Sequence, residues 1–274
     1  MKFAICQELF EGWDWEKQCQ FIARTGYTGI EVAPFALSGP PKSITSDQRT
    51  RYRSVANENG LEIIGLHWLL ARTQGLHLTS RDESVRRATS DYLIDLADLC
   101  ADLGGDIMVF GSPLQRNLAD GMSRDAGLDL ATEVFRAAMP RIAERNVTIC
   151  MEPLTPKETN FINTCADAAE LIERVASPYF MLHQDVKAML SESEPIPELI
   201  QKWRELTRHF HVNDSNLLGP GMGETDYHPI LRALQDSGYD GWVSVEVFDY
   251  APGCEHIARA SLQYLKETLA DVAQ

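Results

Sequence analysis

TICMEP, at residues 148–153, is a short apolar run followed by a carboxylate, and three later stretches repeat its pattern. They are YFMLHQD (179–185), HFHVND (209–214) and WVSVEVF (242–248). Short runs of apolar and β-branched residues are typical of buried strands. A charged side chain in such a run needs a partner, because an unpaired charge in the protein interior costs several kcal/mol. These stretches therefore predict four strands whose polar ends face a metal ion, an ion pair or a wet cleft.

Strand-like runs and helical patterns alternate along the whole chain. We predict strands at residues 3–9, 29–34, 62–68, 106–111, 148–154, 179–186, 208–213 and 242–248. We predict helices between them at residues 15–25, 47–59, 83–103, 123–145, 165–176, 195–205, 229–237 and 255–270. Eight consecutive β-α units with short buried strands favour an α/β fold, a closed (β/α)8 TIM barrel with its helices outside.

The length of 274 residues suits one such domain spanning residues 1–274, because TIM barrels commonly have roughly 250 residues. The alternative is an open, doubly wound sheet. That fold would need a glycine-rich phosphate turn after the first strand, where Gln7, Glu8 and Leu9 supply none. We therefore expect no nucleotide cofactor.

Composition indicates a small-molecule enzyme. The formal net charge of −15 opposes nonspecific binding to nucleic acid, which needs clustered Lys and Arg. The six cysteines include no C-x-x-C pair, and the first residues lack a signal-peptide pattern. No apolar stretch approaches the ~20 residues that span a bilayer. These observations predict a cytoplasmic protein that binds neither nucleic acid nor membrane.

The four acidic or imidazole residues at the strand ends are candidate metal ligands: Glu152, Asp185, His211 and Glu246. The catalytic groups of TIM barrels gather at the carboxyl ends of the strands. The fifth to eighth strands are neighbours in the barrel, so these side chains are expected to converge on one ion. Three carboxylates and one imidazole suit Mn²⁺, Mg²⁺ or Co²⁺ better than a thiolate-held zinc. An ion pair is the alternative for any single acid, and four candidate ligands at equivalent positions favour a metal.

Several motifs together resemble one family, the xylose isomerase-like TIM barrels. They are MEPL (151–154) followed by Glu158, HQD (183–185), HFH (209–211), PGMG (220–223) and SVE (244–246). The resemblance is nearest to ketose 3-epimerases, inosose dehydratases and hydroxypyruvate isomerases. It implies that the four candidate ligands bind a divalent metal and that Glu152 and Glu246 also form the acid/base pair. We expect Mn²⁺ as the metal. It further implies a homodimer or a homotetramer.

The expected function is that of a divalent-metal-dependent isomerase or epimerase acting on a keto-sugar. A hydrogen beside a ketone becomes removable when a metal polarises the carbonyl, since the resulting enediolate carries its charge on metal-bound oxygens. A lyase or dehydratase acting on an inosose or a 3-keto-glycoside through the same enediolate is the alternative. A remote alternative is an apurinic-site endonuclease. Gly111 and Ala188 stand where two of its zinc-binding histidines are expected, and the acidic chain opposes DNA binding.

The substrate contacts differ from those of the ketose epimerases. Ala188 and Leu217 stand where those enzymes usually have a histidine and an arginine that hold substrate oxygens, which favours a keto-sugar derivative. Residues expected to contact substrate are His67, Trp68, Arg116, Glu158, Lys187 and His209. Plain structural alternatives are a satisfied histidine for His67, a surface acid for Glu158 and a solvated loop residue for Lys187.

Overall fold

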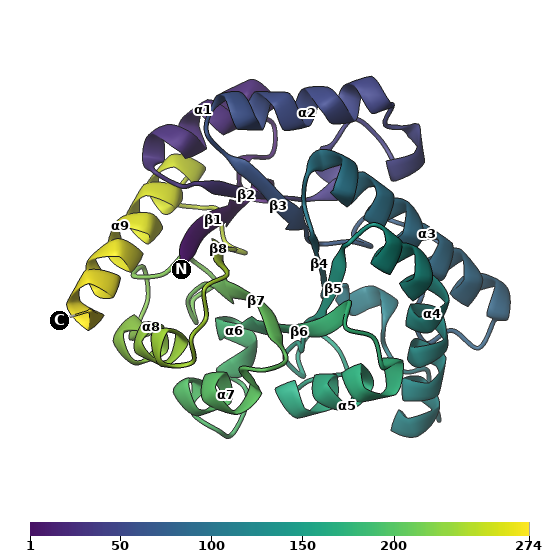
Figure 1. Ribbon diagram of the computed structural model, residues 1–274. Helices are drawn as coiled ribbons and strands as arrows, with labels where there is room; N and C mark the ends of the chain where they lie inside the picture. Colours follow the sequence, from purple (N-terminus) through teal and green to yellow (C-terminus); the bar gives the residue numbers. More distant parts are fainter. Residues whose placement is uncertain (274) are drawn as a thin grey trace.

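The computed structural model describes residues 1–273, and within that range eight parallel strands close into a barrel, as predicted (Figure 1). Each strand pairs with the next one in the chain, and β8 closes the ring against β1. The strands are β1 (Lys2–Cys6), β2 (Gly29–Val32), β3 (Glu62–Leu66), β4 (Ile107–Phe110), β5 (Thr148–Met151), β6 (Phe180–Asp185), β7 (Thr207–Val212) and β8 (Trp242–Val245). The predicted domain end at residue 274 lies outside the described residues.

Helices surround the barrel on its outer side (Figure 1). They are α1 (Trp15–Thr25), α2 (Ser46–Glu58), α3 (Glu83–Leu103), α4 (Arg124–Glu144), α5 (Cys165–Val175), α6 (Val186–Met189), α7 (Ile196–Trp203), α8 (Tyr227–Asp236) and α9 (Cys254–Val272). Within residues 1–273, no helix is both long and apolar enough to cross a membrane.

The chain turns sooner after several strands than predicted. Residues 7–9, expected at the end of the first strand, belong to the 3-10 turn η1 (Gln7–Phe10), in which Glu11 N–H donates to the Glu8 carbonyl at 3.1 Å. Residues 152–154, expected in the fifth strand, follow the end of β5. Pro153 has no N–H to donate to a strand ladder, so the chain leaves the sheet there.

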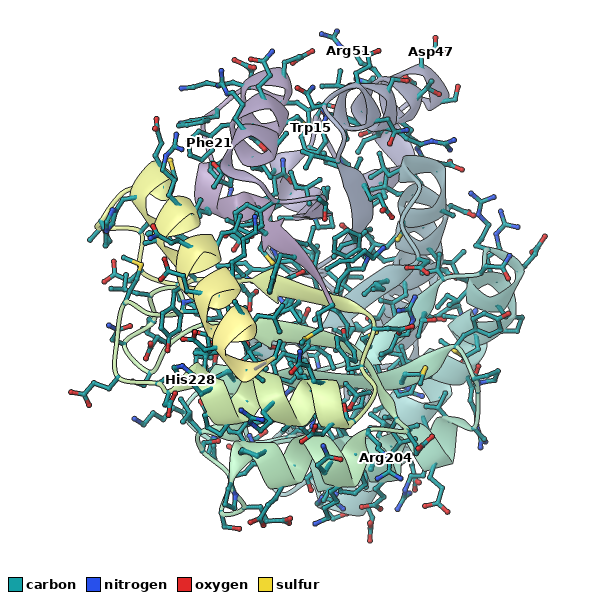
Figure 2. The ribbon with its side chains drawn as sticks, turned by 60° about the vertical axis from the view of Figure 1, so that its left-hand side comes forward. Trp15, Phe21, Asp47, Arg51, Arg204 and His228 are labelled. Carbon is teal, nitrogen blue, oxygen red and sulfur yellow. The ribbon has the colours of Figure 1, made fainter. Side chains whose placement is uncertain are left out.

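The outer helices pack through amphipathic faces. Trp15 of α1 contacts α2, where its Nε1 donates to the Tyr52 carbonyl at 2.9 Å (Figure 2). Asp47 and Arg51 point away from the barrel on the exposed side of α2 (Figure 2). Gly26, with φ of 104°, ends α1 in the left-handed conformation that glycine adopts without steric cost.

The parallel strands bring their carboxyl ends to one rim of the barrel. In the register of β6 and β7, His183 lies opposite His209 and Asp185 lies opposite His211. His211 in turn lies opposite Ser244 of β8. Polar side chains distant in the sequence therefore meet in the barrel interior at this rim.

Candidate active site

Three of the four predicted ligands lie together at the rim. Glu152, Asp185 and His211, with His183, each offer a ligand atom, and these atoms all lie within 4.8 Å of one another. Glu152 directly follows β5, Asp185 ends β6 and His211 lies near the end of β7. All four side chains are buried. The group therefore contains two carboxylates and two imidazoles.

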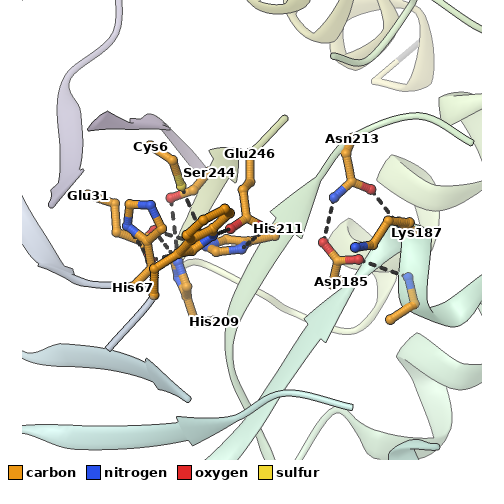
Figure 3. A network of polar contacts seen from close by, with 12 residues as sticks. Cys6, Glu31, His67, Asp185, Lys187, His209, His211, Asn213, Ser244 and Glu246 are labelled. Carbon is orange, nitrogen blue, oxygen red and sulfur yellow. Dashed lines mark hydrogen bonds and ion pairs between the residues drawn. The ribbon is translucent and has the colours of Figure 1, made fainter. Parts of the chain in front are cut away.

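Glu246, the fourth predicted ligand, is one contact away. Its Oε2 lies 3.2 Å from His211 Nδ1, and its Oε1 accepts a hydrogen bond from Trp68 Nε1 at 2.7 Å. It also belongs to a neighbouring buried group with Cys6, Glu8 and His67. Glu246 thus connects the two groups through His211 (Figure 3).

Asp185 is held by one donor from α6 and one from the loop after β7. Ala188 N–H donates to its Oδ1 at 2.8 Å, and Asn213 Nδ2 donates to its Oδ2 at 2.6 Å (Figure 3). Asn213 is itself fixed, because its backbone N–H donates to the Tyr227 hydroxyl at 3.0 Å. Each carboxylate oxygen has a second lone pair. Asp185 is therefore oriented by the protein and can still bind an ion.

Burial and crowding separate the pKa values of the carboxyl groups. Burial, followed by the charges of Glu246 and Asp185, holds the pKa of Glu152 well above its usual range. Burial also raises the pKa of Asp185. For Glu246, the charge of His211 and its hydrogen bond outweigh the effect of burial, so its pKa lies below the usual value. The close carboxylates leave an excess of negative charge that a cation would relieve.

His183 gives a further sign that the group suits a metal. Both of its ring nitrogens are buried and lack a hydrogen-bond partner among residues 1–273. Buried polar atoms are usually satisfied, so such an atom calls for an explanation such as a bound ion or water. Oxygen donors supplemented by imidazole fit Mn²⁺, Mg²⁺ or Co²⁺. The residues present therefore fit a divalent cation.

A cavity of about 360 Å³ opens beside these groups. Four predicted substrate contacts line it: His67, Trp68, Glu158 and Lys187. The two residues predicted to form the acid/base pair, Glu152 and Glu246, line it as well. Its apolar lining comes mainly from the loops after β3, β4, β5 and β8: Ala71, Pro113, Leu114, Leu154 and Phe248. Leu114 is 75% exposed, which places an apolar side chain at the solvent side of the cavity.

Lys187 and Glu158 form an ion pair in the cavity wall. Lys187 Nζ lies 2.8 Å from Glu158 Oε1 and 3.7 Å from the centre of the Phe248 ring. Glu158 Oε2 accepts hydrogen bonds from the backbone N–H and the hydroxyl of Thr155, at 3.0 and 2.8 Å. Both charged side chains are therefore fixed at the cavity surface rather than free in solvent.

Arg116, a predicted substrate contact, is not among the residues that line the cavity. Its side chain is fully buried and donates to the carbonyls of Gly111, Glu152 and Ile162, at 3.1, 2.6 and 2.8 Å. Arg116 thus ties together the loops after β4 and β5. The sequence places Arg116 on a long loop but does not show that this loop folds inward.

His209 also lies away from the cavity wall, one layer deeper in the barrel. Its Nε2 lies 2.8 Å from Glu31 Oε2, and both residues are fully buried. His209 is therefore not among the residues that line the cavity, and its contact with substrate stays a prediction. Side chains alternate between the faces of a strand, so a residue two positions before His211 shares its face at greater depth.

Two buried glutamates complete the polar interior, and the sequence left their roles open. Glu8 Oε2 lies 2.5 Å from His67 Nε2, and Glu31 contacts both His209 and His211 (Figure 3). Glu31 has the signal that identified the other acids, a charge inside an apolar strand. Its partners lie on β7, across the barrel, which the sequence alone does not indicate.

Comparison with known proteins places the chain among sugar-converting barrels. Residues 19–268 match the family described as xylose isomerase-like TIM barrel. The chain is 27% identical to the D-psicose 3-epimerase of Enterocloster bolteae, over 86% of this chain and 77% of that protein. The D-psicose 3-epimerase of Clostridium cellulolyticum H10 with D-tagatose superposes with a TM-score of 0.87, at 20% identity, over 98% of this chain and 99% of that one. The apo 3-keto-D-glucoside 4-epimerase of E. coli gives a TM-score of 0.85, at 20% identity, over 97% and 99% of the two chains.

Proposed function

The chain belongs to the xylose isomerase-like TIM barrel family, and we propose from its site that it is a divalent-metal-dependent epimerase or isomerase of keto-sugars. One observation carries the proposal: Glu152 and Glu246 reach the same cavity from β5 and β8, beside a donor group suited to a cation. The names of the relatives, D-psicose 3-epimerase and 3-keto-D-glucoside 4-epimerase, support this class of reaction.

Glu152, Asp185, His211 and Glu246 are the residues proposed to hold the metal, with Mn²⁺ as the expected ion. When bound, the metal would polarise the ketone carbonyl and the hydroxyl beside it. The fixed orientation of Asp185 and the crowding of carboxylates around Glu152 support this assignment. His183 lies within the same group and is proposed to support it.

Glu246 and Glu152 are proposed to move the proton. The lowered pKa of Glu246 favours its carboxylate, which is the form that accepts a proton from the carbon beside the ketone. Glu152, the other carboxylate that reaches this cavity, is proposed to return the proton to the opposite face of that carbon. Removal by one residue and return by the other on the opposite face inverts the carbon. The reverse reaction exchanges the two roles.

The cavity lining supports a keto-sugar derivative as substrate. The Lys187–Glu158 pair and His67 offer polar contacts near the acid/base residues. Pro113, Leu114 and Phe248 add apolar surface to the same lining, beside the polar side chains of Arg72, Ser112 and Gln115. Burying a hydroxyl without a partner costs about 1–3 kcal/mol, so a substituent with few hydroxyls suits the apolar part of the lining better than the tail of a free hexose. A glycoside oxidised to a ketone meets both requirements.

The cysteines support a reducing compartment, and we propose a cytoplasmic location. All six are free thiols, and five of them are buried. Disulfides are rare in the cytoplasm, where thiols are kept reduced.

The proposed function is tested by product analysis. The Mn²⁺-loaded protein is incubated with ketohexoses, inososes and 3-keto-glucosides with apolar or polar aglycones, and products are assigned by NMR. An epimer or an aldose–ketose pair is expected, with faster turnover of keto-glycosides than of free hexoses. Glu173→Gln, on the exposed side of α5, is the charge-matched control and should keep wild-type activity. An unsaturated or cleaved product would assign a lyase, and no turnover of any substrate would contradict the proposal.

A further inference from the structure

Glu31 is a fully buried carboxylate in the interior of the barrel. It lies in β2 beside Cys6 of β1 and Gly65 of β3. Its Oε2 lies 2.8 Å from His209 Nε2, and both of its oxygens lie 3.1 Å from His211 Nε2 (Figure 3). Glu31 therefore joins β2 to two histidines of β7, on the other side of the barrel.

The contacts of Glu31 fix the direction of the His211 ring. An ionised carboxylate only accepts hydrogen bonds, so Nε2 of His211 must carry the proton that Glu31 accepts. The other ring nitrogen, Nδ1, faces Oε2 of Glu246, one of the proposed metal ligands, at 3.2 Å. A neutral imidazole with its proton on Nε2 has its lone pair on Nδ1.

We propose that Glu31 is the positioning residue of His211: it holds the proton on Nε2 and so directs the lone pair of Nδ1 to the metal. The inference rests on the metal centre of the proposed function. Histidine ligands commonly donate their second ring N–H to a carboxylate, which fixes the tautomer and increases the basicity of the ligating nitrogen. Here that carboxylate comes from the second strand, far from every proposed ligand in the sequence.

His209 keeps Glu31 in place. Its Nε2 donates to Glu31 Oε2, and the Ser244 hydroxyl lies 3.4 Å from the same nitrogen. The rings of His209 and His211 are 5.0 Å apart between centres and nearly perpendicular, at 80°. Two imidazoles on one buried carboxylate restrict its rotation, so Glu31 presents a fixed acceptor to His211.

The test is the Mn²⁺ affinity of Glu31→Gln, measured by calorimetry on protein stripped of metal. Glutamine has nearly the same size, but its single carbonyl oxygen replaces two carboxylate oxygens and its amide donates toward the rings. We expect the dissociation constant to rise about 10–100-fold, the usual effect of losing such a partner. Glu8→Gln is the matched control, because it removes another buried carboxylate near Glu246 that pairs with His67 instead of His211. We expect that control to weaken binding by less than Glu31→Gln does, because Glu8 pairs with His67 and not with His211.

Equal losses in the two variants would mean that Glu31 acts only through its charge, and unchanged affinity in Glu31→Gln would mean no role. Either result overturns the proposal. If wild-type protein itself binds no Mn²⁺, the proposed metal function fails instead, so the two failures are distinguishable.

A measurement on wild-type protein keeps the test valid if Glu31→Gln does not fold. Long-range ¹H–¹⁵N spectra of histidine rings, recorded with diamagnetic Mg²⁺ or Zn²⁺, report which nitrogen of His211 carries the proton. Protonated Nε2 with metal-shifted Nδ1 is expected. Protonated Nδ1 with the metal on Nε2 would overturn the proposal.

Discussion

Trp68→Phe tests how the protein sets the basicity of Glu246. Trp68 Nε1 donates to Glu246 Oε1 at 2.7 Å, and Glu246 is only 3% exposed. The Trp68 ring also contacts Phe35 and Phe248, with centres 5.9 and 6.5 Å away. Phenylalanine keeps an aromatic ring in this position and, like tryptophan, must adopt the left-handed backbone conformation there, with φ of 53°. The substitution therefore removes mainly one hydrogen-bond donor.

The magnitude follows from the charge of the acceptor. A hydrogen bond to a charged group stabilises by about 1.5–3 kcal/mol, and a shift of one pKa unit corresponds to 1.36 kcal/mol. Losing the bond disfavours the carboxylate of Glu246, so its pKa should rise by about one to two units. A base must be ionised to accept the proton. The acidic limb of the kcat/KM profile should therefore move to higher pH by the same amount.

The assay is the rate of substrate conversion between about pH 5 and 9, with thermal unfolding as a check on folding. Phe248→Leu is the control, because it removes a neighbouring ring of Trp68 without touching the hydrogen bond. It should raise KM and leave the acidic limb in place. An unmoved limb in Trp68→Phe, with Mn²⁺ bound, would refute the assignment of Glu246 as the base.

Three further predictions concern stability and substrate binding. The pKa of Glu152 is raised in the folded protein, so metal-free folded protein keeps a proton on this group that unfolded protein loses above pH 4.5. The free energy of unfolding should therefore fall as the pH rises from 4.5 toward the raised pKa. Glu152→Gln should remove this pH dependence and raise the Tm near pH 8 by about 2–4 °C per kcal/mol relieved, measured by calorimetry; an identical pH dependence in the variant would contradict it. Arg116→Met leaves three buried carbonyls without their donor and should lower the free energy of unfolding by about 3 kcal/mol or more in urea titrations; a raised KM at unchanged stability would instead return Arg116 to the substrate site. Lys187→Met should raise KM about tenfold with little change in kcat, and an unchanged KM would show that its pair with Glu158 is only structural.

Long periodic elements could be predicted from the sequence, and short ones set by tertiary contacts could not. The predicted helices at residues 15–25 and 83–103 match α1 and α3 at both ends. Both end at a left-handed glycine, Gly26 or Gly104, which is a local signal. The sequence did not indicate α6, which has only four residues. Its first turn depends on the Asp185 side chain, which accepts a hydrogen bond from the Ala188 N–H. The proposed metal ligand Asp185 is thus also the N-cap residue of α6.

The candidate site was predictable where its residues end strands. Glu152, Asp185 and Glu246 each end or directly follow a strand, so topology alone brings them to one rim. The direction of the Arg116 side chain could not be predicted in this way, because it depends on two carbonyls of another loop, the one after β5. The partners of Glu31 could not be predicted either, because they are 178 and 180 residues away in the chain. Sequence patterns therefore identify which side chains reach the rim, and packing between loops and across the barrel decides what each one contacts.

Deuterium exchange tests the proposed proton transfer most directly. Mn²⁺-loaded protein is incubated with a converted keto-sugar in D₂O, and NMR locates the deuterium in substrate and product. The two-carboxylate mechanism predicts deuterium at the inverted carbon beside the carbonyl, and loss of that exchange in both Glu152→Gln and Glu246→Gln despite bound metal. Conversion without deuterium at that carbon, or full exchange in both variants, would contradict the mechanism.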